Sequence, residues 1–165
     1  MFFLSTHRLK FRCWTDDDLP LARSLWGDPR VTHFLSMTST EAAITERLQR
    51  EITRQRELGF QYWPMFSIEN DELVGCCGLQ PYKDIFELGF HLRPPYWGQG
   101  LALEAARAVM DYGFDTLGMS ELFAGHHPEN MASKKVLEKL GFVYVGDAVY
   151  EASGRMEPGY RVKKK

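Results

Sequence analysis

Hydrophobic and polar positions recur along this chain with two periods, and the changes of period predict where strands and helices lie. The clearest strand covers residues 85–92, where every second side chain is apolar. Between those apolar positions stand Glu87, Gly89 and His91, which therefore share the opposite face of the strand. We expect one face of this strand to be core and the other to border a polar space.

A helical period follows at residues 41–58. Its apolar positions recur every four residues, at Ile44, Leu48 and Ile52. Thr38 and Glu41 have the spacing of a capping box, which favours a helix start there. The apolar stripe is thin and the remaining positions are mostly Glu, Arg, Gln and Thr, so two interpretations stay open: a solvated helix over one edge of the core, or a lid beside a substrate.

The other elements are predicted from shorter patterns and from turn residues. Strands are expected at residues 7–14, 62–68, 73–79 and 121–125, and a closing hairpin at 142–150 with 159–162. Helices are expected from the Asp16–Asp18 run to about residue 26, from the glycine segment near residue 100 to about residue 117, and at 130–140. This order is mixed α and β, which indicates the α+β class.

Composition limits the classes of protein that remain. A chain of 165 residues suits a single domain over 1–165, and the formal net charge of -2 argues against a dedicated nucleic-acid binder. No apolar run is long enough for a membrane helix, and the first residues lack a secretory pattern, so we expect a cytoplasmic protein with no membrane partner. Cys13, Cys76 and Cys77 have no metal-binding spacing and are expected to be buried free thiols.

A glycine-containing segment, Tyr96 to Ala102, lies between the alternating strand and an amphipathic helix. Free backbone N–H groups at such a helix start can converge on an anion, and glycine permits its close approach. The Gly-Lys-Ser/Thr of a nucleotide-triphosphate loop is absent. A dinucleotide loop would need glycine at Leu103. On its own, the segment is compatible with a turn or with an anion site.

Three separated motifs extend this observation. They are Glu87-Leu88-Gly89-Phe90 leading into Pro95-Tyr96-Trp97-Gly98-Gln99-Gly100-Leu101-Ala102-Leu103-Glu104-Ala105, then Asn130-Met131-Ala132-Ser133, then Val136-Leu137-Glu138-Lys139-Leu140-Gly141-Phe142. In this order and spacing the chain resembles the GNAT superfamily of N-acetyltransferases, and most closely its RimJ/RimL-like branch, over nearly its whole length. The resemblance implies a central, mostly antiparallel twisted sheet of about six or seven strands flanked by about four helices.

The resemblance also implies acetyl-CoA as co-substrate. Its pyrophosphate would lie against the backbone of Trp97, Gly98, Gln99, Gly100, Leu101 and Ala102, and its pantetheine arm beside His91, Leu92, Arg93 and Asn130. Many members have Arg or Gln three residues before the first glycine, where this chain has Pro95. That departure removes one side-chain contact and leaves the backbone contacts intact.

For catalysis, the resemblance implies direct attack of a neutral amine on the thioester. The tyrosine that many members use as general acid corresponds here to Leu137. Ser133, one helical turn earlier, is the substitute that the branch resemblance suggests, although a first-turn serine also satisfies helix backbone. Glu87 is the candidate general base because it faces the polar side of its strand, where a purely surface role is the alternative.

The acceptor stays open at this stage. An α-amine with a pKa of about 7.7–8.0 needs less help from a base than lysine at about 10.4, and the branch includes enzymes for protein N-termini and for small amines. Tyr62, Trp63 and Trp26 are candidates for a pocket or for core. The adjacent His126 and His127 suggest a loop, and no metal is expected. A homodimer through the C-terminal strand is possible, and a catalytically silent acyl-CoA-binding module is the alternative function.

Overall fold

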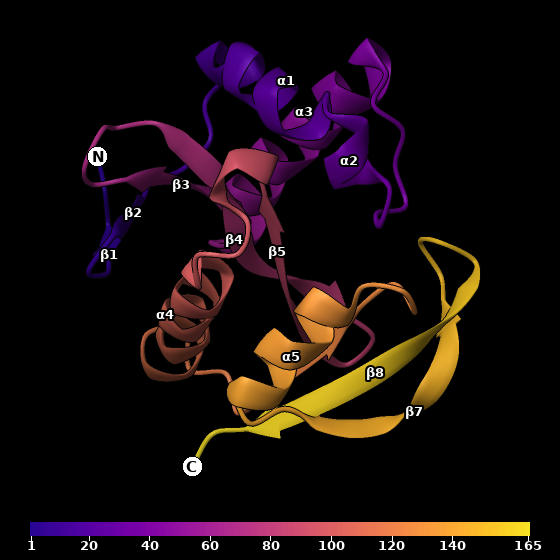
Figure 1. The fold of residues 1–165 in the computed structure, drawn as a ribbon. Helices are drawn as coiled ribbons and strands as arrows, with labels where there is room; N and C mark the ends of the chain where they lie inside the picture. The colour runs from indigo at the N-terminus through magenta and orange to yellow at the C-terminus, as the bar shows by residue number, and fades with distance from the viewer.

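Eight strands form one twisted sheet in this computed structural model, which describes residues 1–165 (Figure 1). The strands lie in the order β1-β2-β3-β4-β5-β6-β8-β7. Only the β5–β6 pair is parallel. Their bounds are β1 Leu4–Ser5, β2 Leu9–Phe11, β3 Tyr62–Ser67, β4 Leu73–Tyr82, β5 Ile85–Leu92, β6 Glu121–Gly125, β7 Val143–Tyr150 and β8 Arg155–Lys163.

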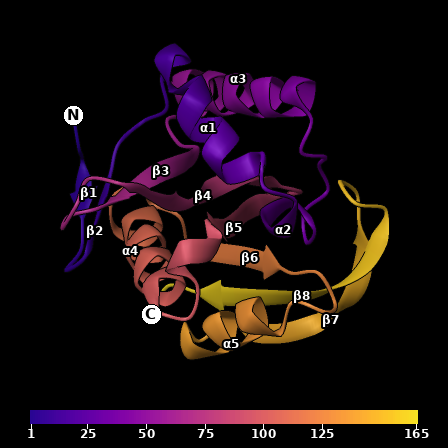
Figure 2. The same cartoon turned by 45° about the horizontal axis from the view of Figure 1, so that its top comes forward.

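Helices cover both faces of the sheet, as Figure 2 shows. One face carries α1 and α3, and the other carries α4 and α5. Their bounds are α1 Leu19–Trp26, α2 Pro29–Thr32, α3 Glu41–Leu58, α4 Leu101–Asp115 and α5 Met131–Lys139, with 3-10 turns at Asp16–Asp18 and Pro94–Tyr96. The central strands are therefore buried on both sides, which explains their nearly continuous apolar sequence.

Neighbouring residues on the central strands supply two separate cores. Tyr62 and Cys76 pack with the α1 and α3 layer, whereas Trp63 and Cys77 pack with the α4 and α5 layer. This division follows from the alternation of side chains along a strand. All three cysteines are free, as predicted. Cys76 and Cys77 on β4 are also buried as predicted, whereas Cys13 is only partly buried.

Several predicted bounds agree with the structure, and others need correction. The expected α3, β5 and β6 match at both ends. The expected strand at residues 7–14 is wrong in extent, because only Leu9–Phe11 pairs with β3, and the two-residue β1 precedes it. Thr40, rather than Thr38, caps α3 by accepting from the Ala43 N–H. The sheet has eight strands, since β1 joins the edge, and the four-residue α2 was not predicted.

The parallel strands β5 and β6 stay paired over a short distance only. Phe86 lies opposite Leu122 and Glu87 lies opposite Phe123, and no further pairs follow. Beyond Glu87 the two strands diverge, so the rest of β5 has no strand partner on that side. The divergence opens the sheet near its middle, between the starts of α4 and α5.

Candidate active site

The start of α4 presents a row of unused hydrogen-bond donors. Gly98 has φ 75° and Gly100 has φ 77°, a left-handed conformation that side chains rarely adopt. The backbone N–H groups of residues 98–103 make no hydrogen bond within the protein, and the first bond of the helix runs from Glu104 N to Gly100 O at 3.2 Å. These N–H groups and the positive end of the helix favour an anionic ligand.

Arg8 fixes this loop from the far end of the chain. Its guanidinium donates to the carbonyl oxygen of Gln99 at 2.9 Å and to the Glu104 carboxylate at 2.7 Å. The Arg8 N–H donates to the same carboxylate at 2.8 Å. The Gln99 carboxamide donates to the Pro95 carbonyl at 3.0 Å. The loop is therefore held in place before any ligand arrives.

A groove of about 420 Å³ runs from this loop between α4 and α5. Eight of the predicted cofactor-binding residues line it: His91, Leu92, Trp97, Gly98, Gly100, Leu101, Ala102 and Asn130. Arg93 and Gln99 do not line it, because their side chains donate to the Leu73 carbonyl and to the Pro95 carbonyl. The Trp97 indole donates to the Leu92 carbonyl at 2.8 Å, which fixes one wall of the groove.

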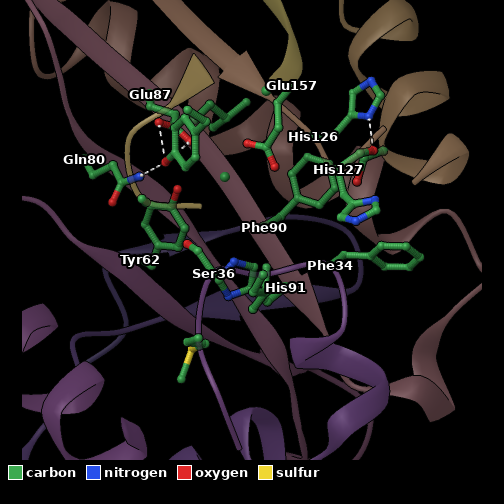
Figure 3. Close-up of a pocket in the computed structure, with 18 of the residues that line it drawn as sticks. Phe34, Ser36, Tyr62, Gln80, Glu87, Phe90, His91, His126, His127 and Glu157 are labelled. Carbon is green, nitrogen blue, oxygen red and sulfur yellow. Dashed lines mark hydrogen bonds between the residues drawn. The ribbon is translucent and has the colours of Figure 1, made fainter. Parts of the chain in front are cut away.

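A second cavity, of about 390 Å³, lies on the other side of β5 (Figure 3). Its walls come from α3, from the loop between α2 and α3, from β4 and β5, from the end of β6 with the loop after it, from α5, and from the β7–β8 hairpin. The groove and the cavity share Phe34, Leu35, Phe90, His91, Asn130 and Ser133 in their linings. The two spaces therefore meet where β5 and β6 diverge.

Glu87 faces the second cavity and is only 7% exposed. The Tyr150 hydroxyl lies 3.0 and 2.9 Å from its two carboxylate oxygens and donates to them, while the Gln80 carboxamide donates to that hydroxyl at 3.2 Å. Burial raises the pKa of Glu87 to about 7, and the hydrogen bond from Tyr150 opposes that shift. A carboxyl group with this pKa can accept and release a proton near neutral pH.

His91 has a different environment, although it shares a strand face with Glu87. Its Nδ1 accepts a hydrogen bond from the Trp26 indole at 3.1 Å, and Cys76 Sγ lies 3.6 Å from the same nitrogen. Burial holds the pKa of His91 well below its usual range, so the ring is neutral. Burial also raises the pKa of the Cys76 thiol, which leaves Cys76 a poor nucleophile despite its neighbouring histidine.

The start of α5 places Asn130 and Ser133 at the junction of the two spaces. The Asn130 carboxamide oxygen caps the helix by accepting from the Ser133 N–H at 3.2 Å. The Ser133 hydroxyl makes no hydrogen bond within the protein, so the capping role expected as its alternative belongs to Asn130. Leu137 is buried and contributes to the cavity wall.

Aromatic and histidine candidates divide between core and cavity. Trp63 and Trp26 are buried in the two cores, whereas Tyr62 also lines the cavity. A Cβ on Gly89 would lie 2.1 Å from the Tyr62 hydroxyl oxygen, so the bare backbone of Gly89 makes room for that ring. His126 bonds the Tyr160 hydroxyl at 3.2 Å.

Neither a metal-binding cluster nor a membrane span is found in the fold. No group of three or more His, Cys, Asp and Glu residues has an arrangement that could hold a metal ion. None of the helices has the length and apolar character that crossing a membrane requires.

Tyr150, Gln80 and an arginine face of α3 are parts of the cavity that the sequence did not reveal. Arg47, Arg50 and Arg54 line it. Their spacing along one helix face was visible in the sequence, but nothing local showed that this face turns inward. Tyr150 reaches Glu87 from a strand 63 residues away in the chain, and no local pattern reports such a contact.

The fold, the loop at α4 and the paired cavities define an acyltransferase of the GNAT type. Residues 8–143 match the family model of the acetyltransferase (GNAT) domain, and the chain belongs to this family of N-acetyltransferases, which use acetyl-CoA.

Individual relatives agree with this assignment. The chain is 32% identical over 145 residues to the uncharacterized N-acetyltransferase p20 of Bacillus licheniformis, covering 84% of this chain and 81% of p20. It is 28% identical over 153 residues to the spermidine N(1)-acetyltransferase of Escherichia coli strain K12, covering 89% and 79%.

Solved structures show the same fold. A GNAT-family acetyltransferase from Bacillus anthracis has a TM-score of 0.82 at 25% identity and covers 99% of this chain and 98% of its own. A RimL ribosomal L7/L12 α-N-protein acetyltransferase in complex with coenzyme A has a TM-score of 0.80, with coverage of 99% and 98%. Its identity of 15% makes it evidence of the fold alone. The structural neighbours thus include RimL-like enzymes, and the predicted GNAT fold is confirmed.

Proposed function

We propose that this N-acetyltransferase transfers the acetyl group of acetyl-CoA to a primary amine by direct attack, with the donor in the groove at α4 and the amine in the cavity beside Glu87. The observation that carries the proposal is the junction of the two spaces at Phe90, Asn130 and Ser133. Two substrates bound from opposite sides of β5 would meet there, and no covalent acyl-enzyme is needed.

The residues at α4 fit acetyl-CoA. The free N–H groups of residues 98–103 suit its pyrophosphate, and the apolar lining of the groove at Leu92, Leu101 and Val136 suits its pantetheine arm. The Asn130 amide N–H groups stay available to that arm, because only its oxygen is used for capping. When bound, acetyl-CoA supplies the acetyl thioester.

Glu87 acts as general base, directly or through water. With its pKa near 7, Glu87 is substantially ionised at physiological pH and can accept the proton that the amine loses on attack. The Tyr150 hydroxyl holds the carboxylate in one orientation and favours its charged form. Tyr150 is thus a positioning residue for the base.

The unpaired edge of β5 supplies donors for charge that develops on the thioester oxygen. Arg93 N donates to the Val74 carbonyl of β4 at 2.9 Å, and peptide groups alternate in direction along a strand. The peptide groups of Phe90 and Leu92 therefore point toward the side from which β6 diverges. An N–H there would stabilise the oxyanion, and the Ser133 hydroxyl would donate to the departing sulfur.

Titration calorimetry with acetyl-CoA, followed by thiol release with a panel of amines, tests this proposal. The panel contains peptides with free N-termini, spermidine and small monoamines, because relatives include a spermidine enzyme and fold neighbours include protein N-terminal enzymes. Binding followed by turnover of at least one amine is expected. Binding without turnover would instead favour a silent acyl-CoA-binding module, and absence of binding would refute the assignment of the groove.

A further inference from the structure

The acceptor cavity carries opposite charges on its two walls. Figure 3 shows Glu87 and Glu157 pointing into it, with Tyr62 and Ser36 across from them. The α3 wall holds Arg47, Arg50 and Arg54, whose spacing of three and four residues places them on one face of the helix. The cavity is therefore acidic beside the proposed base and basic along α3.

The basic wall has more positive charge than its own carboxylate can neutralise. Glu51, fully buried, accepts from Arg47 at 2.9 Å and from Arg54 at 3.0 Å, and it also accepts from the Tyr62 N–H at 2.7 Å. Arg50 forms no ion pair. Glu51 is the one carboxylate that forms ion pairs with these three guanidinium ions, and Glu46 acts on Arg50 from the same helix, so the α3 wall keeps an excess of positive charge.

Arg47 provides a second, independent sign of a missing anion. Its side chain is 11% exposed, and its Nη2 is buried without any hydrogen-bond partner. The guanidinium stacks over the rings of Trp26 and Tyr62, at 5.2 and 5.0 Å from their centres, which fixes its direction. A buried guanidinium nitrogen normally has an acceptor, so the α3 wall lacks one at Arg47, and a ligand would reach this donor after a small shift of the side chain.

The electrostatics of Arg50 agree with this view. Partial burial lowers the pKa of its guanidinium, and the positive charge of Arg47 lowers that pKa further. Arg50 is exposed and stays charged, so solvent screens part of this effect, and an anion beside it would oppose the charge of Arg47. An anionic group held between Arg47 and Arg50 would provide that anion.

We infer that the acceptor is a small amine that also carries a carboxylate, with its amine beside Glu87 and its carboxylate bound by Arg47 and Arg50. This inference rests on the proposed function and narrows its substrate class. A polyamine would bring a second cation to the arginine wall, which costs binding energy in a partly desolvated cavity. A neutral monoamine would leave the Arg47 donor unpaired.

The test compares amines of equal length that differ only at the far end. Each ω-amino acid from glycine to 6-aminohexanoate is paired with the monoamine and the diamine of the same chain length. We expect the best amino acid to have a kcat/KM roughly tenfold or more above those of the monoamine and the diamine of its length, because the loss of a hydrogen-bonded charge pair typically weakens binding by about that factor. A higher kcat/KM for the monoamine, the diamine or a neutral peptide would overturn the inference.

Two arginine variants identify the wall responsible. For the amino acid, Arg50→Gln should raise KM roughly tenfold and change kcat less than about twofold, and for the monoamine it should leave KM unchanged. Arg50→Lys keeps the positive charge and should raise KM for the amino acid less than Arg50→Gln does. Arg56→Gln is the matched control, because Arg56 is exposed on the same helix and does not line the cavity. An equal rise in KM for the monoamine would contradict a carboxylate contact.

Failure of the inference and failure of the proposed function give different results. Turnover of amines without any preference for the carboxylate would leave acetyl transfer standing and refute the acceptor class. If no amine releases thiol, calorimetry of the same amino acids against the protein with CoA still tests recognition. Binding that Arg50→Gln weakens would then support the inference, and absence of binding would refute it.

Discussion

Tyr150→Phe is the sharpest test of the proposed base. The substitution removes the hydroxyl that donates to Glu87 and keeps the ring, which stacks near Tyr82 with centres 6.2 Å apart. The Gln80 carboxamide loses its acceptor at the same time and becomes free to approach the carboxylate. The perturbation is therefore local and acts on the charge of Glu87 rather than on the packing.

The size of the effect follows from the hydrogen bond that is lost. A hydrogen bond to a charged group contributes about 1.5–3 kcal/mol, and 1.36 kcal/mol corresponds to one pKa unit. Gln80 can replace part of the loss, so we expect the pKa of Glu87 to rise from about 7 by roughly one unit. The ionised fraction at pH 7 then falls from about one half to about one tenth, which lowers kcat/KM about fivefold.

The assay is thiol release at several pH values between about 6 and 9, with one amine and saturating acetyl-CoA. The ionisation of the amine is the same for both proteins, so it cancels in the ratio of their kcat/KM values. That ratio should be near one at the alkaline end and fall about fivefold by pH 7.

Tyr144→Phe provides the control, because Tyr144 also donates to a carboxylate, Asp147 at 2.8 Å, but lies exposed on the same strand. Its ratio should stay flat. A flat ratio for Tyr150→Phe as well would refute the assignment of Glu87 as a base tuned by Tyr150.

Three further predictions test the loop, the acid and the buried carboxyl. Gly98→Ala and Gly118→Ala introduce similar backbone strain, at φ 75° and 72°, and no atom lies within 4 Å of either new Cβ. Only Gly98 lies in the proposed pyrophosphate site, so only Gly98→Ala should weaken acetyl-CoA binding, by at least about tenfold in calorimetry. Equal affinities of the two variants would argue against ligand contact at Gly98. Ser133→Ala should lower kcat about tenfold with little change in acetyl-CoA affinity, and unchanged single-turnover rates would remove Ser133 from the mechanism. The pKa of Glu87 rises from 4.5 to about 7 on folding, so the folded protein binds this proton more tightly and its stability falls by about 3 kcal/mol as pH rises across that window. In denaturant unfolding between pH 5 and 8, Glu87→Gln should lack the loss of stability that this carboxyl causes. Identical losses in both proteins would show that the carboxyl is not buried as described.

The parts of the fold that could be predicted are those whose residues carry their own signal. Residues 41–58 have a helical period ended by Gly59 in the left-handed conformation, and β5 has strict alternation, so their bounds follow from local chemistry. The two-residue β1 exists only through its pairing with β2, and the four-residue α2 is too short to show a period. Such elements depend on neighbours that the local sequence does not specify.

The residues of the candidate site also divide into those that the local sequence shows and those that only the fold brings together. The loop at α4 is one continuous segment, and its glycines and the helix after it could be recognised together. The arginine wall was visible as a spacing along α3 but was compatible with a solvated face, because only the packing of α3 over β3 and β4 turns Arg47 inward. Tyr150 could not be assigned at all, since its contact with Glu87 joins strands that are distant in the sequence.

Glu87 and His91 show what a strand pattern determines and what it leaves to the fold. Alternation places both on one face of β5, and the sequence treats them as equivalent neighbours of a polar space. Burial then shifts each pKa toward its uncharged form, but the partners differ: Tyr150 donates to Glu87 and supports its charge, whereas the Trp26 indole donates to Nδ1 of a neutral His91. Only Glu87 therefore retains a pKa near neutral pH, and of the two residues only Glu87 fits the proposed role of base. The donors that decide this difference come from β7 and α1, so the choice of Glu87 as the proposed base depends on tertiary structure, while its strand face follows from the sequence.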